Sequence, residues 1–143
     1  MKIAIVNGPN LNLTGKREPE IYGSQTFESY VPWLREQFPM HEIVYFQSNV
    51  EGELIDFLQA CGNEDRSVLL NAGGYTHTSV ALHDAVAAIR VPVVEIHMSQ
   101  VAAREEYRHT SLLGSACIGT IAGFGMDSYR LGILALAKRE LEA

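Results

Sequence analysis

The sequence predicts an α/β protein in which a parallel β-sheet lies between two layers of helices. Short apolar segments that indicate strands alternate with amphipathic segments that indicate helices, five times over 143 residues. The strand segments are continuously apolar, which is typical of parallel strands buried on both faces. A chain of this length with 47% hydrophobic residues can bury a stable core, so we expect one catalytic domain over residues 1–143.

The first unit is a buried strand followed by a long connection. Residues 2–6 predict the strand, and residues 7–23 show neither helical nor strand periodicity. Connections of about four to six residues are usual, and longer ones are mostly either disordered or functional. Because this stretch carries Asn, Arg and Tyr side chains among Gly and Pro, we interpret it as a lid that carries chemistry.

The second unit is more regular. We expect a helix over 29–37 with Thr26 as its N-cap. Residues 42–47 are rich in β-branched and aromatic side chains and predict a strand. An amphipathic helix over 51–61 follows, and Gly62 is expected to close it.

The remaining units complete the alternation. They comprise a strand at 67–71, a polar loop at 72–79, a helix at 80–89, a strand at 91–97, a loop with a helical turn at 98–108, a strand at 117–122 and a helix at 127–142. Five such units fit a flavodoxin-like three-layer α/β/α sandwich with strand order 2-1-3-4-5.

Composition excludes several classes of partner. A net charge of −6 argues against generic nucleic-acid binding, although a local arginine cluster could still hold a small anion. No apolar run approaches the roughly 20 residues of a membrane span, and no secretory signal precedes the first strand. We therefore expect a cytoplasmic protein without a membrane partner. Cys61 and Cys117 lack CxxC spacing and are better explained as reduced thiols than as a disulfide.

Polar side chains gather after the predicted strands, at the edge where parallel sheets bind ligands. Such sheets bind ligands outside the carboxyl ends of their strands, near the switch in strand order. The opposite edge has ordinary connections, and this asymmetry predicts an active site. Its candidates are Asn7, Asn10, Asn12, Arg17 and Tyr22 after the first strand, Asn71, Gly73, Thr76, His77 and Ser79 after the third, and Glu95, His97, Ser99, Arg104 and Arg108 after the fourth.

Glu95 and His97 are two residues apart on one strand and therefore face the same way. The carboxylate could orient the imidazole and raise its basicity. The alternative is that both lie at an exposed strand end. We favour a functional pair, because a charge in a central strand is costly unless it is paired.

Tyr22 and His77 each allow two interpretations. Tyr22 could pack the loop shut, or act as a general base if guanidinium groups such as Arg17 lower its pKa from the ordinary value of about 10. His77 could cap the following helix or contact a ligand.

Arg104 and Arg108 are four residues apart on the predicted helical turn and would share a face. They could serve a site or form a surface ladder with Glu105 and Glu106. Asp84, within a predicted helix, is by itself most simply a solvated charge.

Two other kinds of site are not supported. The segment from Gly8 to Lys16 is two residues too long for a nucleotide phosphate loop, and Arg17 stands where Ser or Thr is required. No pair or trio of His, Cys, Asp and Glu has convincing metal spacing. Any catalysis is expected to be metal-free.

Four blocks of the sequence, in order, resemble the type II 3-dehydroquinate dehydratases. The first is Asn-Gly-Pro-Asn-Leu-Asn-Leu at 7–13 with Gly-Lys-Arg-Glu-Pro at 15–19 and Tyr-Gly at 22–23. The others are residues 71–79, 95–99 and 104–111. The match covers nearly the whole chain, and this combination of blocks is highly specific.

The resemblance implies a lyase without metal or cofactor that acts on 3-dehydroquinate. Water would leave by anti elimination through an enolate, giving 3-dehydroshikimate. Tyr22 would take the C2 proton as a phenolate favoured by Arg17 and Arg104. Asn12 would help to hold the water that stabilises the enolate. The type I route to this product needs a Schiff-base lysine, and none of the few lysines here is well placed as a buried amine.

The resemblance also assigns the acid and the binding residues. His97, oriented by Glu95, would protonate the departing C1 hydroxyl. The substrate-binding residues would be Asn71 and Gly73, the backbone amides of Met98 and Ser99, His77 and Arg108 toward the ring hydroxyls, and Asp84 from a neighbouring subunit. A homo-oligomer follows, typically a dodecamer of trimers.

The chain departs from the family pattern at positions that carry no proposed catalytic role. Ala72 and Gly74 stand where proline and alanine are usual, Thr14 where leucine is usual, and Gln100 where asparagine is usual. The alternatives are a non-catalytic flavodoxin-like ligand-binding module and an inactive assembly subunit. A phosphoacceptor module should have acidic residues after the first strand, where this chain has Asn7 and Gly8, and a flavin binder should have a Ser/Thr-rich phosphate loop there. The intact polar set argues against the inactive subunit.

Overall fold

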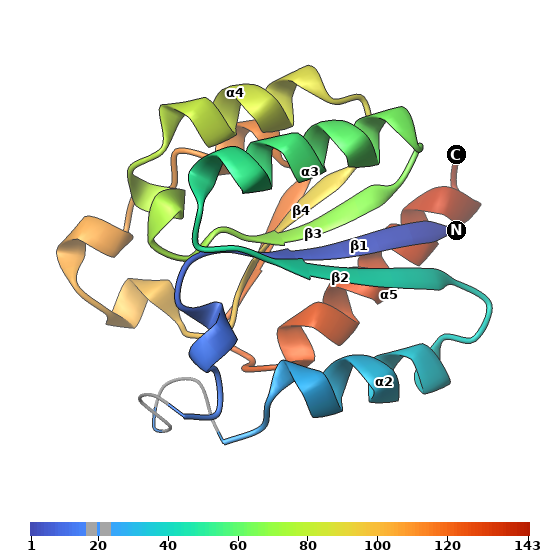
Figure 1. The fold of residues 1–143 in the computed structure, drawn as a ribbon, viewed down its shortest axis with the longest axis horizontal. Coiled ribbons are helices and arrows are strands. Elements are labelled where there is room, and N and C mark those ends of the chain that lie inside the picture. The colour runs from blue at the N-terminus through green and yellow to red at the C-terminus, as the bar shows by residue number, and fades with distance from the viewer. Residues whose placement is uncertain (17–19, 21–23) are drawn as a thin grey trace.

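The computed structural model describes residues 1–16, 20 and 24–143 (Figure 1). Within these residues, five parallel strands form one sheet in the order β2-β1-β3-β4-β5. The strands are β1 (Lys2–Asn7), β2 (Glu42–Gln47), β3 (Ser67–Asn71), β4 (Val93–His97) and β5 (Gly119–Ala122). The predicted flavodoxin-like fold and strand order are confirmed.

Helices cover both faces of the sheet. The helices α3 (Glu51–Asn63) and α4 (Val80–Ala88) lie on one face, and α2 (Phe27–Gln37) and α5 (Asp127–Leu141) lie on the other (Figure 1). In β1, Ile3 and Ile5 pack toward α2 and α5, whereas Ala4 and Val6 pack toward α3 and α4. All four are completely buried, which explains why the strand reads as a continuous apolar run.

The predicted connection over 7–23 is only partly without periodicity, because Leu11–Leu13 forms a 3₁₀ helix. The prediction that Gly62 closes its helix is wrong. The helix α3 continues to Asn63, and Asp65 is the residue with a positive φ, of 56°. Gly62 instead leaves room for α4, since a Cβ there would lie 3.0 Å from Ile89 Cγ2.

The other differences are shifts at the ends of elements. The strand β4 begins at Val93 rather than at residue 91, because Pro92 has no N–H for the ladder. The strand β5 begins at Gly119 rather than at residue 117. Val80 is apolar but lies on the first turn of α4 and is 63% exposed.

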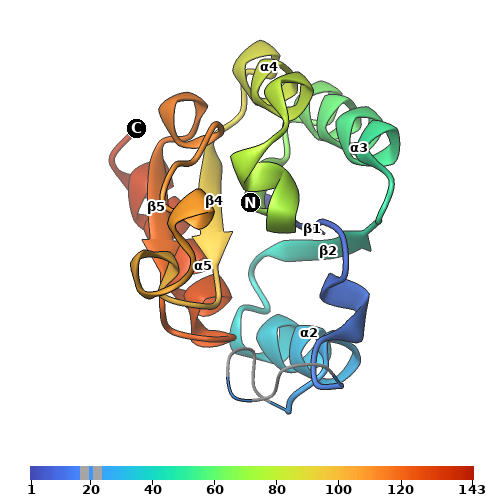
Figure 2. The ribbon, with the colours of Figure 1, turned by 90° about the vertical axis from the view of Figure 1, so that its left-hand side faces the viewer.

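The carboxyl ends of the strands share one edge, which faces the viewer in Figure 2. Short 3₁₀ helices at this edge follow β1, β3 and β4: Leu11–Leu13, Gly73–His77, Val101–Ala103 and Glu106–Arg108. The fold therefore brings together the segments that carry the predicted site. In the described chain, no helix is both long and apolar enough to cross a membrane.

Gly8 holds the loops after β1 and β3 in direct backbone contact. Its N–H donates to the Asn71 carbonyl at 2.7 Å, and a Cβ on Gly8 would lie 2.4 Å from the Ala72 carbonyl oxygen. Backbone cannot rotate away as a side chain can, so Gly8→Ala must displace one loop. We expect Gly8→Ala to lower the free energy of unfolding by about 1–3 kcal/mol in urea titrations. Gly52→Ala is the control, because nothing lies within 4 Å of the added methyl. Equal stability of Gly8→Ala and wild type would contradict this prediction.

Candidate active site

A polar cavity lies at the carboxyl edge of the sheet. The described residues that line it come from the segments after β1, β3 and β4: Pro9, Asn10, Leu11, Asn71, Gly73, Gly74, His77, His97, Met98, Ser99, Val101, Arg104 and Arg108. Most of the predicted binding residues are among them. The chain as a whole is acidic, yet two guanidinium groups line this cavity, so it suits a small anion.

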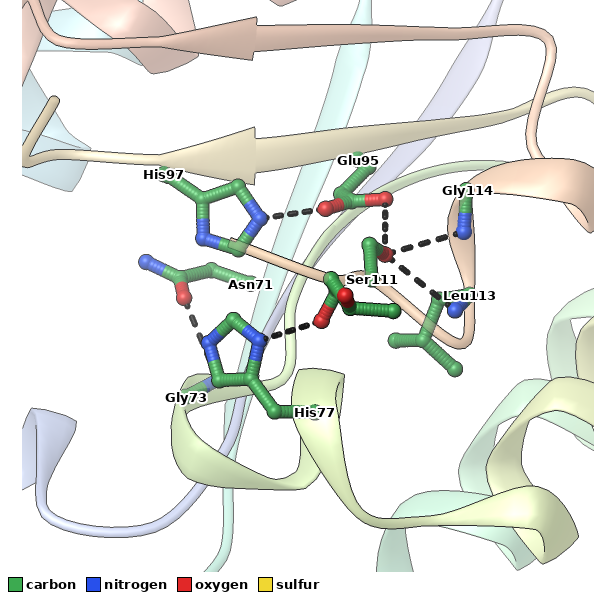
Figure 3. A network of polar contacts seen from close by, with 9 residues as sticks. Asn71, Gly73, His77, Glu95, His97, Ser111, Leu113 and Gly114 are labelled. Carbon is green, nitrogen blue, oxygen red and sulfur yellow. Dashed lines mark hydrogen bonds and ion pairs between the residues drawn. The ribbon is translucent and has the colours of Figure 1, made fainter. Parts of the chain in front are cut away.

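Glu95 and His97 form a buried pair at the end of β4 (Figure 3). Glu95 is 2% exposed and His97 is 6% exposed, so the alternative of an exposed strand end is excluded. The Nε2 atom of His97 hydrogen-bonds Oε2 of Glu95, and the other ring nitrogen lies on the side of Asn71 (Figure 3). Burial alone would raise the pKa of Glu95. The hydrogen bond and charge of His97, with the Ser111 hydroxyl, outweigh burial and hold that pKa below its ordinary value.

The His77 ring stacks on the His97 ring, and a hydrogen bond to the backbone of Thr110 holds it in place. The two ring centroids are 6.3 Å apart, with planes 19° from parallel. Nδ1 of His77 donates to the Thr110 carbonyl at 2.8 Å, because a carbonyl can only accept. His77 does not cap α4. Ser79 does so, by accepting the Leu82 N–H at 2.9 Å.

Asn71 is held by contacts that the sequence did not indicate. Its Nδ2 donates to the Tyr129 hydroxyl at 2.9 Å. Its Oδ1 accepts the Gly73 N–H at 3.2 Å, as Figure 3 shows. The Tyr129 hydroxyl in turn donates to Oδ1 of Asn7 at 2.8 Å. Burial raises the pKa of Tyr129, so the hydroxyl keeps its proton and its role as a donor. Tyr129 lies within the helix predicted over 127–142, but nothing in that pattern indicates this role.

The segment after β4 places the two arginines, although not on one helical turn as predicted. Arg104 adopts an extended conformation (φ −100°, ψ −166°) between two separate 3₁₀ helices. Both arginines nevertheless line the cavity. Glu105 lies between them, with Oε2 2.7 Å from Arg108 Nε and 3.7 Å from Arg104 Nε. Its own backbone hydrogen bond and the Arg108 guanidinium lower the pKa of Glu105 to about 2. The two arginines thus line the cavity and also contact Glu105, so each of the two interpretations describes part of what is observed.

Met98 and Ser99 follow β4 directly and line the cavity. Met98 is buried, and its carbonyl accepts the Gly125 N–H at 2.9 Å. Ser99 Oγ accepts a long hydrogen bond of 3.4 Å from Arg104 Nη1. These contacts fix the turn whose amides were predicted to bind a carboxylate.

Asn12 and Asp84, two of the residues that the resemblance assigns to the site, do not line the cavity of the described chain. Asn12 is exposed on its 3₁₀ helix, and Asn10 and Leu11 line the cavity in its place. Asp84 is exposed on α4, with Oδ1 3.2 Å from His83 Nδ1. Arg17 and Tyr22 lie outside the described residues. The base that the resemblance implies is therefore a sequence inference alone.

Ser111 is a further residue that sequence reasoning missed. Its hydroxyl donates to Oε1 of Glu95 at 2.8 Å, on the side of the carboxylate away from His97 (Figure 3). The residue belongs to one of the blocks that carry the resemblance, but its position in the chain gave no signal of this contact.

Comparison with known proteins agrees with this arrangement. Residues 1–137 match the sequence model of the family described as dehydroquinase class II. The chain is 51% identical over 138 residues to a 3-dehydroquinate dehydratase of Carboxydothermus hydrogenoformans, covering 95% of this chain and 90% of that protein. It is 46% identical to the 3-dehydroquinate dehydratase of Clostridium acetobutylicum, covering 95% and 96%.

A solved structure gives the same answer. The crystal structure of a type II dehydroquinase from Butyrivibrio crossotus superposes with a TM-score of 0.91 at 39% identity, covering 96% of this chain and 97% of that one. The fold, the cavity at the sheet edge and the match along nearly the whole sequence lead to one conclusion: the chain belongs to the class II dehydroquinase family.

Proposed function

We propose that this chain is a 3-dehydroquinate dehydratase, which removes water from 3-dehydroquinate to give 3-dehydroshikimate. The observation that carries the proposal is the buried Glu95–His97 pair, whose histidine lines a polar cavity at the carboxyl edge of the sheet. The relatives named above bear this activity in their names. The substrate is a small carboxylate with ring hydroxyls, which matches a cavity lined by arginine, histidine and amide groups.

His97 is the acid in this proposal. Its Nε2 is engaged by Glu95, so Nδ1 is the atom from which a proton can pass to the substrate. The Glu95 carboxylate stabilises the imidazolium form, as a buried anion beside a cation does. Protonation of the C1 hydroxyl lets it depart as water, and the electron pair of the enolate forms the new double bond.

Tyr22 is the base, on the sequence resemblance described above. Its phenolate takes the C2 proton and leaves the enolate, with Arg17 and Arg104 favouring the phenolate and Asn12 helping to hold a stabilising water. Acid and base are then separate groups with opposite protonation states, as this elimination requires.

The remaining assignments concern binding and assembly. Asn71, Gly73 and the amides of Met98 and Ser99 hold the carboxylate, and His77 and Arg108 hold the ring hydroxyls. Support comes from their position around one cavity, and Asn71 has a second Nδ2 hydrogen with no partner in the described chain. Asp84 is exposed and does not line the cavity of its own chain, and it would serve a neighbouring subunit of a dodecamer of trimers. We propose residues 1–143 as a single catalytic domain of a cytoplasmic enzyme.

The test is turnover by the purified protein. On addition of 3-dehydroquinate, the ultraviolet absorbance of the conjugated enone is expected to rise, with product mass lower by one water. A substrate deuterated at one C2 position tests the anti stereochemistry. A folded, pure protein that leaves 3-dehydroquinate unchanged would overturn the proposal and favour the non-catalytic module.

A further inference from the structure

We propose that Ser111 is a positioning residue for the acid, because its hydroxyl fixes Glu95 as an anion and thereby sets how readily His97 gives up its proton. The inference deepens the function proposed above and rests on it for the identity of the reaction. In the described chain the Ser111 hydroxyl hydrogen-bonds Glu95, Leu113 and Gly114 but not His97, so it acts through Glu95.

The direction of the Ser111 hydroxyl is determined by its neighbours. A serine hydroxyl has one hydrogen to donate and two lone pairs to accept with. The backbone N–H groups of Leu113 and Gly114 donate to Ser111 Oγ, at 3.2 and 3.0 Å (Figure 3). Its single hydrogen therefore points to Oε1 of Glu95, 2.8 Å away. If Oε1 of Glu95 were protonated, its hydrogen would face the hydrogen of the Ser111 hydroxyl. The arrangement therefore favours the ionised form of Glu95.

The turn around Gly114 brings these donors close to the carboxylate. A Cβ on Gly114 would lie 3.3 Å from Glu95 Oε1 and 3.5 Å from Ser111 Oγ, so the absence of a side chain permits the approach. The preceding residue, Thr110, binds His77 through its carbonyl. One short segment thus fixes both the ring that stacks on His97 and the carboxylate that pairs with it.

The Ser111 hydroxyl matters because, among the described residues, few other groups close to Glu95 can stabilise its negative charge. The titratable groups that face Glu95 in the described chain are His97, His77 and Cys117. Burial and the Glu95 charge raise the pKa of Cys117 to about 12, so this thiol stays neutral. Ser111 is accordingly the neutral donor that stabilises the anion on the side opposite His97. Without the hydrogen bond from Ser111, Glu95 becomes more basic. The Glu95–His97 pair then holds the proton that His97 gives to the substrate more tightly.

The test compares Ser111→Ala with Ser111→Thr, which keeps the hydroxyl. In Ser111→Ala, the basic limb of the pH profile of kcat is expected to move about one unit upward, the size expected from losing one charge-assisted hydrogen bond. The acidic limb stays, and kcat at the optimum falls about tenfold with little change in KM. In ¹⁵N spectra of the ligand-free protein, His97 is expected to titrate about one unit higher. Ser111→Thr restores both positions.

Ser48→Ala is the matched control. Ser48 likewise donates to a carboxylate (Glu53) and accepts a backbone N–H, from Val50 at 2.9 Å, but in the described chain no histidine hydrogen-bonds its partner. We expect Ser48→Ala to lower the melting temperature and leave both titrations unchanged.

Unchanged titrations in Ser111→Ala, with or without a lower melting temperature, would reduce Ser111 to a structural residue. A shift in the ¹⁵N titration without a shift in the kcat profile would also overturn the positioning role. The ¹⁵N titration needs no substrate, so failure of this inference is distinguishable from failure of the proposed dehydratase activity.

Discussion

Replacing His97 by glutamine is expected to lower kcat by about 100- to 10,000-fold, the range for loss of a general acid. The amide of glutamine can donate a hydrogen bond to Glu95 but cannot give up a proton. The buried carboxylate therefore keeps a partner, and the fold is expected to survive, as circular dichroism can verify. His41→Gln is the control, since His41 binds the amino terminus at the opposite edge of the sheet.

The distinctive result concerns a partial reaction. Without the acid, the base still removes the C2 proton and returns a solvent proton to the enolate. His97→Gln in deuterium oxide is therefore expected to place deuterium at C2 of recovered 3-dehydroquinate, observable by proton NMR, while little product forms. Normal turnover by this variant would remove His97 from the reaction.

Replacing Tyr22 by phenylalanine is expected to abolish both elimination and deuterium exchange at C2. The phenolate is the proposed base, so its loss stops the reaction before the enolate forms, again by a factor of about 100 to 10,000 or more. Arg17→Ala is expected to act in the same direction, because the guanidinium favours the phenolate. Rapid exchange by Tyr22→Phe would assign the base to another group.

Tyr30→Phe supplies the control for this change. The Tyr30 hydroxyl is buried in α2 with no hydrogen-bond partner among the described residues. Its removal is expected to leave kcat unchanged and the free energy of unfolding within about 1 kcal/mol of wild type, because the hydroxyl has no strong hydrogen bond to lose in the described chain. Together, the His97 and Tyr22 variants separate proton removal from water loss.

The sequence was most informative where the structure follows a short regular pattern of residues, such as an apolar run or the two-residue repeat of a strand. The strand Ser67–Asn71 has the bounds that its apolar run predicts. The spacing of Glu95 and His97 placed both on one face of a strand, and the structure pairs them. The rule for the carboxyl edge of parallel sheets brought together segments that are far apart in the chain.

The parts that failed depend on tertiary contacts. Gly62 resembles a helix terminator, but the close approach of Ile89 explains the glycine instead. Arg104 and Arg108 are spaced as on one α-helix, yet Arg104 is itself extended, and the two arginines come together at the cavity wall and around Glu105. The contact between Ser111 and Glu95 spans 16 positions and two elements. No local pattern encodes such a contact, because it exists only once the turn at Gly114 has packed against β4.

The hydroxyl of Tyr129 has a consequence for the order in which this chain matures during synthesis. It joins Asn7 and Asn71, the paired last residues of β1 and β3, to the final helix, across 122 positions from Asn7. Chains emerge from the ribosome amino terminus first. A nascent chain that ends at β5 already contains every residue proposed for catalysis and still lacks the hydroxyl that holds the two asparagines. Asn7 and Asn71 are therefore held in the positions needed to bind a ligand only at the end, when α5 packs against the sheet.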